Sequence, residues 1–470
     1  MDAIVPAHGC TACVAFSAQA ALLHNEIHSL QAKVAELQAR LDQNSSNSHK
    51  PPSSNPPWIK LPPKRPTGKK RGGQPGHRGH FRKRLPPRRI DRYEHHIPSH
   101  CRHCQADLPC DPGPNDPPPA WHQVAELPPM TAIVTEHQAH ARTCRECGRL
   151  TRAAFPAGVR EHVIGPRLAA VMSYLAGRCH DGRRVVLEMV QDLFDVPFSL
   201  GSVANYETRM SAALADAHQQ VLSAVRSSPV KHVDETGWKQ AGCLRWLWTA
   251  TTANAATFAI QDARSWEGTC ALLGADGGSG VVCSDRHHAY SPLDARRRQI
   301  CWAHLQRDFL KWSQKGRQTR LLGDDGQAVC KQVFGLWRDF RQGTRSRHQL
   351  RRGVSRLRKR LRQVLTWALR CGDSSATTFC RNLLRIEPAL WTFARVEGVE
   401  PTNNPAERAL RAAVLWRKNS FGCQGDGGCR FVERMLSVVQ TLRLQGRKVL
   451  EFLAVTLAAH RQGHPLPTLV

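Results

Sequence analysis

The sequence predicts a multidomain α+β protein, and three observations lead to this fold class. The chain has 470 residues, which is too long for a single hydrophobic core. A helical apolar pattern over residues 165–225 changes near Pro229 to short apolar and β-branched runs, which are typical of strands. Residues 311–394 return to a helical and basic pattern, with 19 Lys and Arg against 5 Asp and Glu. We therefore expect several folded units, of which one contains a sheet.

The composition of the chain indicates a polyanionic partner. The formal net charge is +29, from 67 Lys and Arg against 38 Asp and Glu. Nucleic acid is the first candidate for this partner, and an anionic membrane surface is the alternative. We find no run of about 18 apolar residues and no signal-peptide pattern, so we expect a cytoplasmic protein that does not enter a membrane. The 17 Cys residues therefore favour metal ligation over a disulfide framework.

Residues 1–45 are predicted to form a helix with a coiled-coil seam. Its apolar residues are spaced alternately by four and three positions, as in an a/d heptad pattern. These residues are Leu23, Ile27, Leu30, Val34, Leu37 and Leu41. The spacing favours a homodimer or higher oligomer, and the alternative is one amphipathic helix packed on its own chain.

Residues 46–95 are predicted to be a disordered basic linker. Ser, Asn and Pro end the helix, and a stretch rich in Gly and Pro follows, which carries Lys69, Lys70 and Arg71. We interpret this stretch as an arm that contacts DNA phosphates. A linker that only keeps the chain soluble is the alternative.

Residues 96–155 are predicted to be a zinc-binding module. Two CxxC pairs occur here, in "CRHC" and "CREC", and such pairs supply two thiolates each to one tetrahedral ion. The pairs are Cys101 with Cys104, and Cys144 with Cys147. We expect them to hold one structural Zn²⁺, and the alternatives are a redox pair or unconnected thiols.

Residues 156–226 are predicted to contain a DNA-binding helix-turn-helix. Three helical segments are present, and the break "DVPFSLGS" separates the second from the third. Ser202 would be the cap or an early residue of the recognition helix, with Asn205 and Arg209 facing DNA. Any three-helix bundle gives the same pattern, so this alternative stays open.

The second half of the chain is predicted to form an α/β core with a helical insertion. The strands and helices from Pro229 follow the order β-β-β-α-β-α-β-α, which fits a ribonuclease-H-like sheet. The first strand, "PVKHV", would end just before Asp234, and the fourth would end at Asp285. The predicted segments are 227–310 for the first part of the core, 311–394 for the basic helical insertion, 395–440 for the last part of the core and 441–470 for a C-terminal helical tail.

Three acids are the candidates for phosphodiester chemistry at this core. Two Mg²⁺ (or Mn²⁺) ions activate the nucleophile and stabilise the leaving oxygen in such reactions, and they require oxygen ligands from several carboxylates. Asp234, Asp285 and Glu407 meet this requirement if the sheet gathers them. Glu235 would point to the opposite face of its strand. Other acids compete for the third position, and these are Asp308, Glu397, Glu400 and Glu433.

The chain resembles the transposases of the insertion-sequence-sixty-six family. The matching segments include "QNSSNSHKPPSSN", "GGQPGHRGH", "HVDETGW", "SDRHHAY", "CWAHLQRDF" and "NNPAERALR", in this order. The resemblance implies a DDE transposase whose catalytic and Mg²⁺-binding acids are Asp234, Asp285 and Glu407. It assigns the zinc ligands to the same four cysteines, Cys101, Cys104, Cys144 and Cys147.

The resemblance also implies partners and a reaction. We expect the protein to bind the terminal inverted repeats of its mobile element, to cleave them to a free 3′-OH and to transfer that end into target DNA. Arg408 and Arg411 would steady the scissile phosphates, and His304 is interpreted as a structural histidine with a weaker role beside the acids. We expect a bacterial, nucleoid-associated protein, with accessory proteins of the element as further candidate partners. The alternatives are an inactive DNA-binding regulator and a nuclease that cuts without joining.

Overall fold

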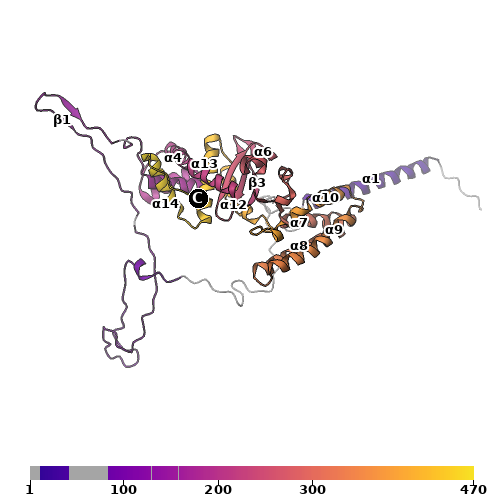
Figure 1. Ribbon diagram of the computed structural model, residues 1–470, viewed down its shortest axis with the longest axis horizontal. Helices are drawn as coiled ribbons and strands as arrows, with labels where there is room; N and C mark the ends of the chain where they lie inside the picture. The colour runs from indigo at the N-terminus through magenta and orange to yellow at the C-terminus, as the bar shows by residue number, and fades with distance from the viewer. Residues whose placement is uncertain (1–10, 42–82, 129, 157) are drawn as a thin grey trace, which may run out of the picture. The chain divides into compact units, whose positions relative to one another are not determined.

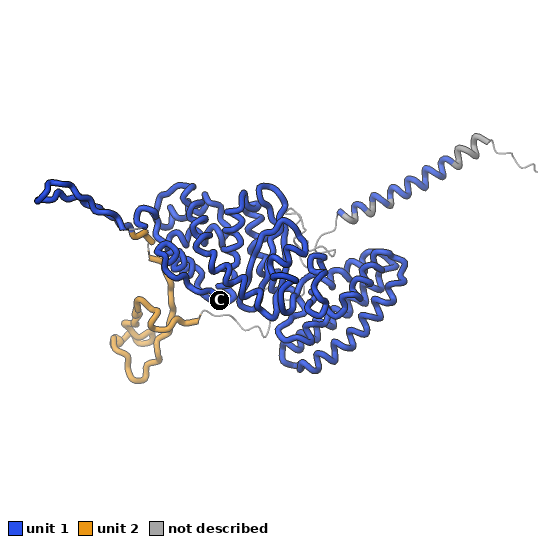
Figure 2. Tube along the Cα trace, turned by 45° about the horizontal axis from the view of Figure 1, so that its top comes forward, with its two compact units in different colours: residues 1–61, 134–470 blue, residues 62–133 orange. Residues whose placement is uncertain are grey.

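The computed structural model describes residues 11–41, 83–128, 130–156 and 158–470. The chain divides into two compact units, one of residues 62–133 and the other of residues 1–61 and 134–470 (Figure 2). Each unit is described by itself. The division lies inside the segment 96–155 that the sequence predicts to be one zinc module.

The larger unit contains a five-stranded mixed sheet with the strand order β5-β4-β3-β6-β7 (Figure 1). The first three strands in the chain pair as an antiparallel meander, β6 runs parallel to β3, and β7 runs parallel to β6. The strands are β3 (Val230–Gln240), β4 (Cys243–Thr251), β5 (Ala256–Gln261), β6 (Val281–Ser284) and β7 (Arg298–Ile300).

Strand β3 is longer than the sequence suggested. We expected the strand to end before Asp234, with a break at Thr236 and Gly237, but β3 continues through both residues and pairs with β4 up to Gln240. The reversal comes at Ala241 and Gly242, which have φ of 48° and 80°. Two consecutive positive φ angles are typical of the two-residue turns that join antiparallel strands. Asp234 therefore lies within a strand and not at its tip.

The helix expected between the fourth and fifth strands of the sheet is absent. Residues 285–297 contain only two short 3-10 turns, η5 (His288–Tyr290) and η6 (Ala295–Arg297). Pro292 lies between them, and proline disrupts a helix interior because it lacks the backbone N–H.

Helix α13 (Asp426–Leu444) covers the edge strand β5. Three of its side chains, each one turn apart, accept hydrogen bonds from alternate backbone N–H groups of β5. Thr441 accepts from Ala256 at 3.0 Å, Ser437 from Phe258 at 2.9 Å and Glu433 from Ile260 at 2.6 Å. These bonds satisfy edge donors that would otherwise be buried without partners.

Further helices pack on the sheet and enclose the first hydrophobic core. Helix α12 (Asn404–Ser420) packs on β3 and β4, α5 (Ala215–Ser227) on β5, and α6 (Trp266–Leu273) on β4; α6 leads into the turn η4 (Ala275–Gly277). The largest fully buried side chains of this core include Trp238, Trp248 and Phe258.

A second hydrophobic core joins the helical insertion, where α7 to α10 run side by side (Figure 1), to buried residues of β6 and β7. Phe309, Trp312 and Phe379 pack together there. Several arginines of the basic stretch 345–362 contact the insertion itself, and Arg358 pairs with Glu387 through two bonds of 2.6 Å. The elements are α7 (Trp302–Lys315), α8 (Arg317–Arg341), α9 (Arg347–Ala368), α10 (Ser374–Arg385), η7 (Glu387–Leu390) and α11 (Thr392–Arg395).

Helical segments from residue 166 onward, together with the last helix of the chain, form a layer that joins the first core. The predicted third helix is divided at Leu214 into α4 (Leu200–Ala213) and α5. The predicted C-terminal tail is part of the core, because α14 (Val449–Gln462) packs on α2 and α4 and buries Phe452 and Leu453. The remaining elements of this layer are α2 (Pro166–Tyr174), the π-helical turn η3 (Leu175–Cys179) and α3 (Arg183–Phe194).

The N-terminal third contains little regular structure among its described residues. Helix α1 (Thr11–Leu41) exposes the whole predicted heptad seam, with Leu30 and Leu37 at 53% and 54% exposure. The other elements are η2 (Pro87–Arg89) and the hairpin of β1 (Ala141–Thr143) and β2 (Leu150–Arg152). None of the helices that the structure describes has the length and apolar character needed to cross a bilayer.

Candidate active site

The register of β3 and β6 brings two of the predicted acids to the same level of the sheet. His232 of β3 lies opposite Cys283 of β6 in this parallel pair. Two residues further along each chain stand Asp234 and Asp285, and Asp285 directly follows the last residue of β6. The two acids therefore lie at one level of the sheet, and the charge of Asp285 is among those that raise the pKa of Asp234.

The N-terminus of α12 is held against β3 beside Asp234. Asn403 precedes the helix and is fully buried, and its side-chain amide donates to the carbonyl of Val233 at 2.8 Å. Asn403 is the N-cap residue of α12, but its side chain makes no capping bond and reaches the strand instead. Glu407 lies in the first turn of α12, so this bond holds the helix that carries Glu407 against β3.

The acids act on one another electrostatically. Burial raises the pKa of Asp234 well above its usual range, and the negative charges of Glu235, Asp285 and Glu407 raise it further. A hydrogen bond from the backbone N–H of Glu235 partly offsets these effects. Clustered carboxylates that raise each other's pKa favour a bound proton or a bound cation.

Glu235 has partners that differ from those of Asp234. Its side chain is fully buried, accepts from the Tyr290 hydroxyl and accepts from Arg264 Nε at 2.5 Å. The same guanidinium lies 3.5 Å from Asp285 and packs over the Trp246 ring. Arg264 therefore supplies positive charge to both acids. Tyr290 is the last residue of the quoted segment "SDRHHAY", whereas Arg264 lies outside the quoted segments.

Three of the acids that competed for the third position have structural partners. Asp308 pairs with Arg286 at 2.6 Å, and Glu400 pairs with Arg341 at 2.7 Å. Glu433 accepts from Ile260 on the edge strand, where burial raises its pKa. These contacts occupy three of the four competing carboxylates, and the fourth, Glu397, is exposed. Glu407, in contrast, is one of the acids whose charge raises the pKa of Asp234.

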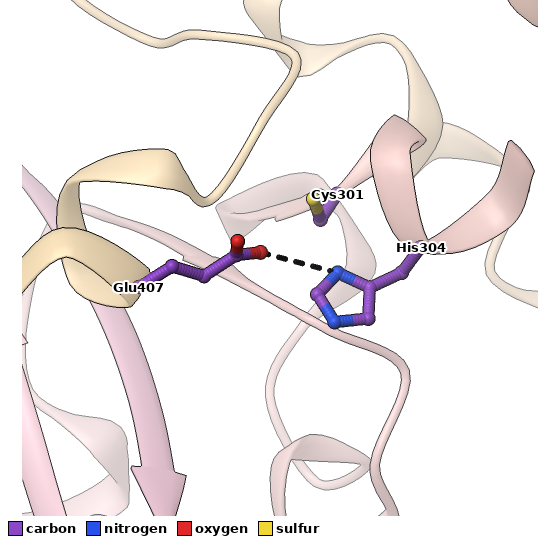
Figure 3. Close-up of side chains that lie close together, drawn as sticks. All are labelled: Cys301, His304 and Glu407. Atoms are coloured by element: carbon purple, nitrogen blue, oxygen red, sulfur yellow. Dashed lines mark ion pairs between the residues drawn. The ribbon is translucent and has the colours of Figure 1, made fainter. Parts of the chain in front are cut away.

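His304 and Cys301 lie next to Glu407 (Figure 3). His304 Nδ1 is 3.7 Å from Glu407 Oε1. Cys301 precedes α7, and its sulfur accepts from the backbone N–H of Asn403 at 3.2 Å. Burial raises the pKa of the Cys301 thiol to about 11, although neighbouring backbone N–H groups counteract this. We interpreted His304 as a structural residue and overlooked Cys301, yet "CWAH" places both one helical turn apart.

The predicted phosphate-binding arginines have different surroundings. Arg408 and Arg411 are exposed on α12, next to and one turn after Glu407. Arg417 on the same helix is half-buried and donates to Thr236 of β3 at 3.1 Å and to the carbonyl of Gly237. The first two are free to meet a ligand, whereas the third joins helix to sheet.

The predicted DNA-facing residues Ser202, Asn205 and Arg209 all lie on α4. Ser199 is the N-cap and accepts from the backbone N–H of Ser202, which is therefore an early helical residue. Asn205 is exposed. Arg209 donates to the carbonyl of Glu161 at 3.0 Å and contacts His162 at 2.7 Å, so its guanidinium is already engaged by its own chain.

The two CxxC pairs adopt the same local conformation. Cys101 accepts from Gln105 through its carbonyl and bonds Ala106 through its N–H, and Cys144 repeats both bonds with Gly148 and Arg149. Backbone N–H groups that point at the sulfurs of Cys101 and Cys144 lower the pKa of both thiols. Cys101 and Cys104 belong to the smaller unit, and Cys144 and Cys147 to the larger, so each pair is described by itself.

Some predicted residues lie outside the described part of the chain. They are Lys69, Lys70 and Arg71 of the basic linker.

The larger unit has a mixed α/β fold with a sheet core, and Asp234 and Asp285 stand at one level of that sheet. A model described as the transposase IS66 family matches residues 181–430, just over half of the chain. The protein belongs to this family, which confirms the resemblance found in the sequence. A second model, of a family of unknown function (DUF6444), matches residues 12–83.

A curated relative covers part of the same chain. It is the uncharacterized protein y4qI of Sinorhizobium fredii, which is 26% identical over 249 residues. The match covers 47% of this chain and 44% of the relative, so the chain spans less than half of that protein's length.

Proposed function

We propose that the protein is a DDE-type DNA transposase that binds the terminal inverted repeats of its element and catalyses metal-dependent strand cleavage and strand transfer. One observation supports this proposal: Asp234 is buried, and the negative charges of Asp285 and Glu407 are among those that raise its pKa. The strand order, with three antiparallel strands followed by two parallel ones, supports a ribonuclease-H-like core.

The donor groups of this cluster fit hard divalent cations. All three acids offer carboxylate oxygens, which Mg²⁺ and Mn²⁺ prefer. Burial first, and neighbouring negative charges second, raise the pKa of Asp234, and bound cations would neutralise those charges. Two bound ions would supply activation of the nucleophile and stabilisation of the leaving oxygen.

The protein's own residues would hold the DNA backbone at this site. Arg264 forms ion pairs with Glu235 and Asp285 and so holds both carboxylates in position. Arg408 and Arg411 project from the helix of Glu407 and would bind the phosphates on either side of the scissile bond. The dipole at the N-terminus of α12 stabilises the negative charge of the Glu407 carboxylate in the first turn.

The remaining segments would provide DNA recognition and assembly. We propose that α3 and α4 form the helix-turn-helix. The ion pair between Arg183 of α3 and Glu207 of α4, at 2.7 Å, links the two helices. Asn205 is the best placed of the predicted contacts because it is exposed. The two CxxC turns would share one structural Zn²⁺, the basic linker would add phosphate contacts, and α1 would join protomers through its apolar seam.

A strand-transfer assay with labelled element ends tests the proposal. The wild type should cleave and join in Mg²⁺ or Mn²⁺, and Asp234→Ala, Asp285→Ala and Glu407→Ala should each lose more than about a thousandfold, since each removes a metal ligand. Asp308→Ala is the matched control, because this acid pairs with Arg286. DNA binding without divalent-dependent cleavage would instead indicate a DNA-binding regulator, and cleavage without joining would indicate a nuclease.

A further inference from the structure

Cys301, His304 and Glu407 form a compact group of mixed ligand atoms. One sulfur, one imidazole nitrogen and one carboxylate oxygen lie within 4.8 Å of one another. Figure 3 shows His304 and Glu407 approaching each other from α7 and α12, with Cys301 beside them. Within the described residues this group has its ligand atoms that close together, whereas Asp234, Asp285 and Glu407 do not form such a group.

Two of the facing atoms have no hydrogen-bond partner in the described part of the chain. His304 Nδ1 and Glu407 Oε1 are both shielded from solvent and unpaired, and their separation of 3.7 Å is too long for a hydrogen bond between them. Buried polar atoms without partners are costly and often face a ligand. An ion between them would satisfy both.

The ligand types select a different class of cation from the three acids. Thiolate and imidazole favour borderline ions such as Zn²⁺, whereas Mg²⁺ takes oxygen ligands. Three protein ligands leave a fourth tetrahedral position open. Asn403, which precedes α12, links this helix to the start of α7, because its backbone N–H donates to the Cys301 sulfur. Its side chain donates to β3, so the same residue also ties α12 to the sheet.

We propose that Cys301, His304 and Glu407 form a second metal site, which takes Zn²⁺ or a similar borderline cation and withdraws Glu407 from Asp234 and Asp285. The consequence for catalysis rests on the proposed function: Zn²⁺ bound here competes with the Mg²⁺ site for a shared carboxylate. The binding itself does not depend on that function.

Cobalt absorption on the full-length protein tests the site directly, because a thiolate ligand gives Co²⁺ a sulfur-to-metal charge-transfer band. Cys301→Ser should lower the absorbance of this band by the contribution of one thiolate ligand. His304→Gln and Glu407→Gln should weaken Zn²⁺ binding at this site by more than about tenfold, as expected for lost coordination. Cys283→Ser, a buried thiol on β6, is the matched control, and Cys101→Ser identifies the absorption of the CxxC pairs.

The outcomes separate the site from the proposed function. A Cys301→Ser spectrum equal to that of the wild type would overturn the site. The site would also be overturned if Asp234→Asn lost as much bound Co²⁺ as Cys301→Ser, because the ion would then be bound by Asp234, Asp285 and Glu407. In Mg²⁺-dependent cleavage, Zn²⁺ should inhibit the wild type more strongly than His304→Gln, each relative to its own zinc-free rate. Equal inhibition would overturn the competition, whereas a complete absence of Mg²⁺-dependent cleavage would count against the proposed function and leave the spectra to decide the site.

Discussion

Asn403 donates its side-chain amide to the carbonyl of Val233 over 2.8 Å, and this bond joins the helix of Glu407 to the strand of Asp234. Both groups are buried. The contact is thus a fixed point between two segments 170 residues apart in the chain.

Removal of this amide should destabilise the protein and weaken its activity. Asn403→Ala leaves the Val233 carbonyl buried without this donor, which should lower the free energy of unfolding by about 1–3 kcal/mol. We also expect DNA cleavage to fall more than stability explains, because α12 loses its position. Urea unfolding and the strand-transfer assay measure both effects. Asn404→Ala, at the exposed neighbouring position, is the control, and equal effects of the two substitutions would contradict the role of Asn403.

The bonds from α13 to the edge strand predict a second stability effect. Thr441→Val removes the acceptor of the buried Ala256 N–H and should cost about 1–3 kcal/mol in the free energy of unfolding. Thr456→Val is a matched control, since the Thr456 hydroxyl bonds only the Phe452 carbonyl of its own helix. If both substitutions lower the free energy of unfolding in urea by the same amount, the bonds from α13 to β5 contribute no more stability than a hydroxyl bonded within its own helix.

A buried histidine predicts a pH dependence of stability. Burial first, and the nearby Arg178 second, lower the pKa of His180 from 6.5 to about 4, and its ring stacks on Trp416. The folded state therefore binds the proton less readily than the unfolded state. The stabilising contribution of the neutral ring is complete above pH 6.5 and is lost as the pH falls toward 4.

Substitution of His180 should weaken this pH dependence. His180→Phe retains an aromatic ring against Trp416 but cannot be protonated. The free energy of unfolding falls between neutral pH and pH 4 in the wild type, and this fall should be smaller in the variant by about 1–3 kcal/mol. Any strain at the positive φ of this residue is independent of pH and cancels in the comparison. Thermal melts across this range provide the measurement, with His464→Phe at an exposed position as the control. Parallel curves for wild type and His180→Phe would contradict the assignment.

The exposed seam of α1 predicts the oligomeric state. Replacement of Leu30 and Leu37 by Glu should convert a dimer or higher oligomer into a monomer, because charges at heptad core positions oppose coiled-coil packing. Sedimentation analysis of the full-length protein measures this change, and Ser29→Glu is the control at a neighbouring exposed position. A wild type that sediments as a monomer would show that the seam does not join protomers.

The sequence predicted some relationships well because spacing along the chain reflects pairing in the sheet. Asp234 and Asp285 are 51 residues apart, which equals the β3–β6 offset between Val230 and Val281. Arg264 could not be predicted, since it follows β5 in a segment without a motif. The role of Glu433 was visible in principle: Glu433, Ser437 and Thr441 place polar groups on one face of a largely apolar helix.

Other differences arose from local chemistry. Thr236 and Gly237 have turn-forming composition, yet the pairing of β3 with β4 keeps them extended. Cys301 was overlooked because a single cysteine has no spacing signal until the fold brings a histidine and a glutamate beside it.

The polar face of α13 also affects aggregation. The outer strand β5 has alternate N–H groups bonded by side chains of the helix, and at the opposite edge Thr392 and Gln299 bond the backbone around β7 and α11. A foreign strand would have to displace these bonds before it could extend the sheet. This barrier opposes the edge-to-edge pairing of sheets from which cross-β aggregates form.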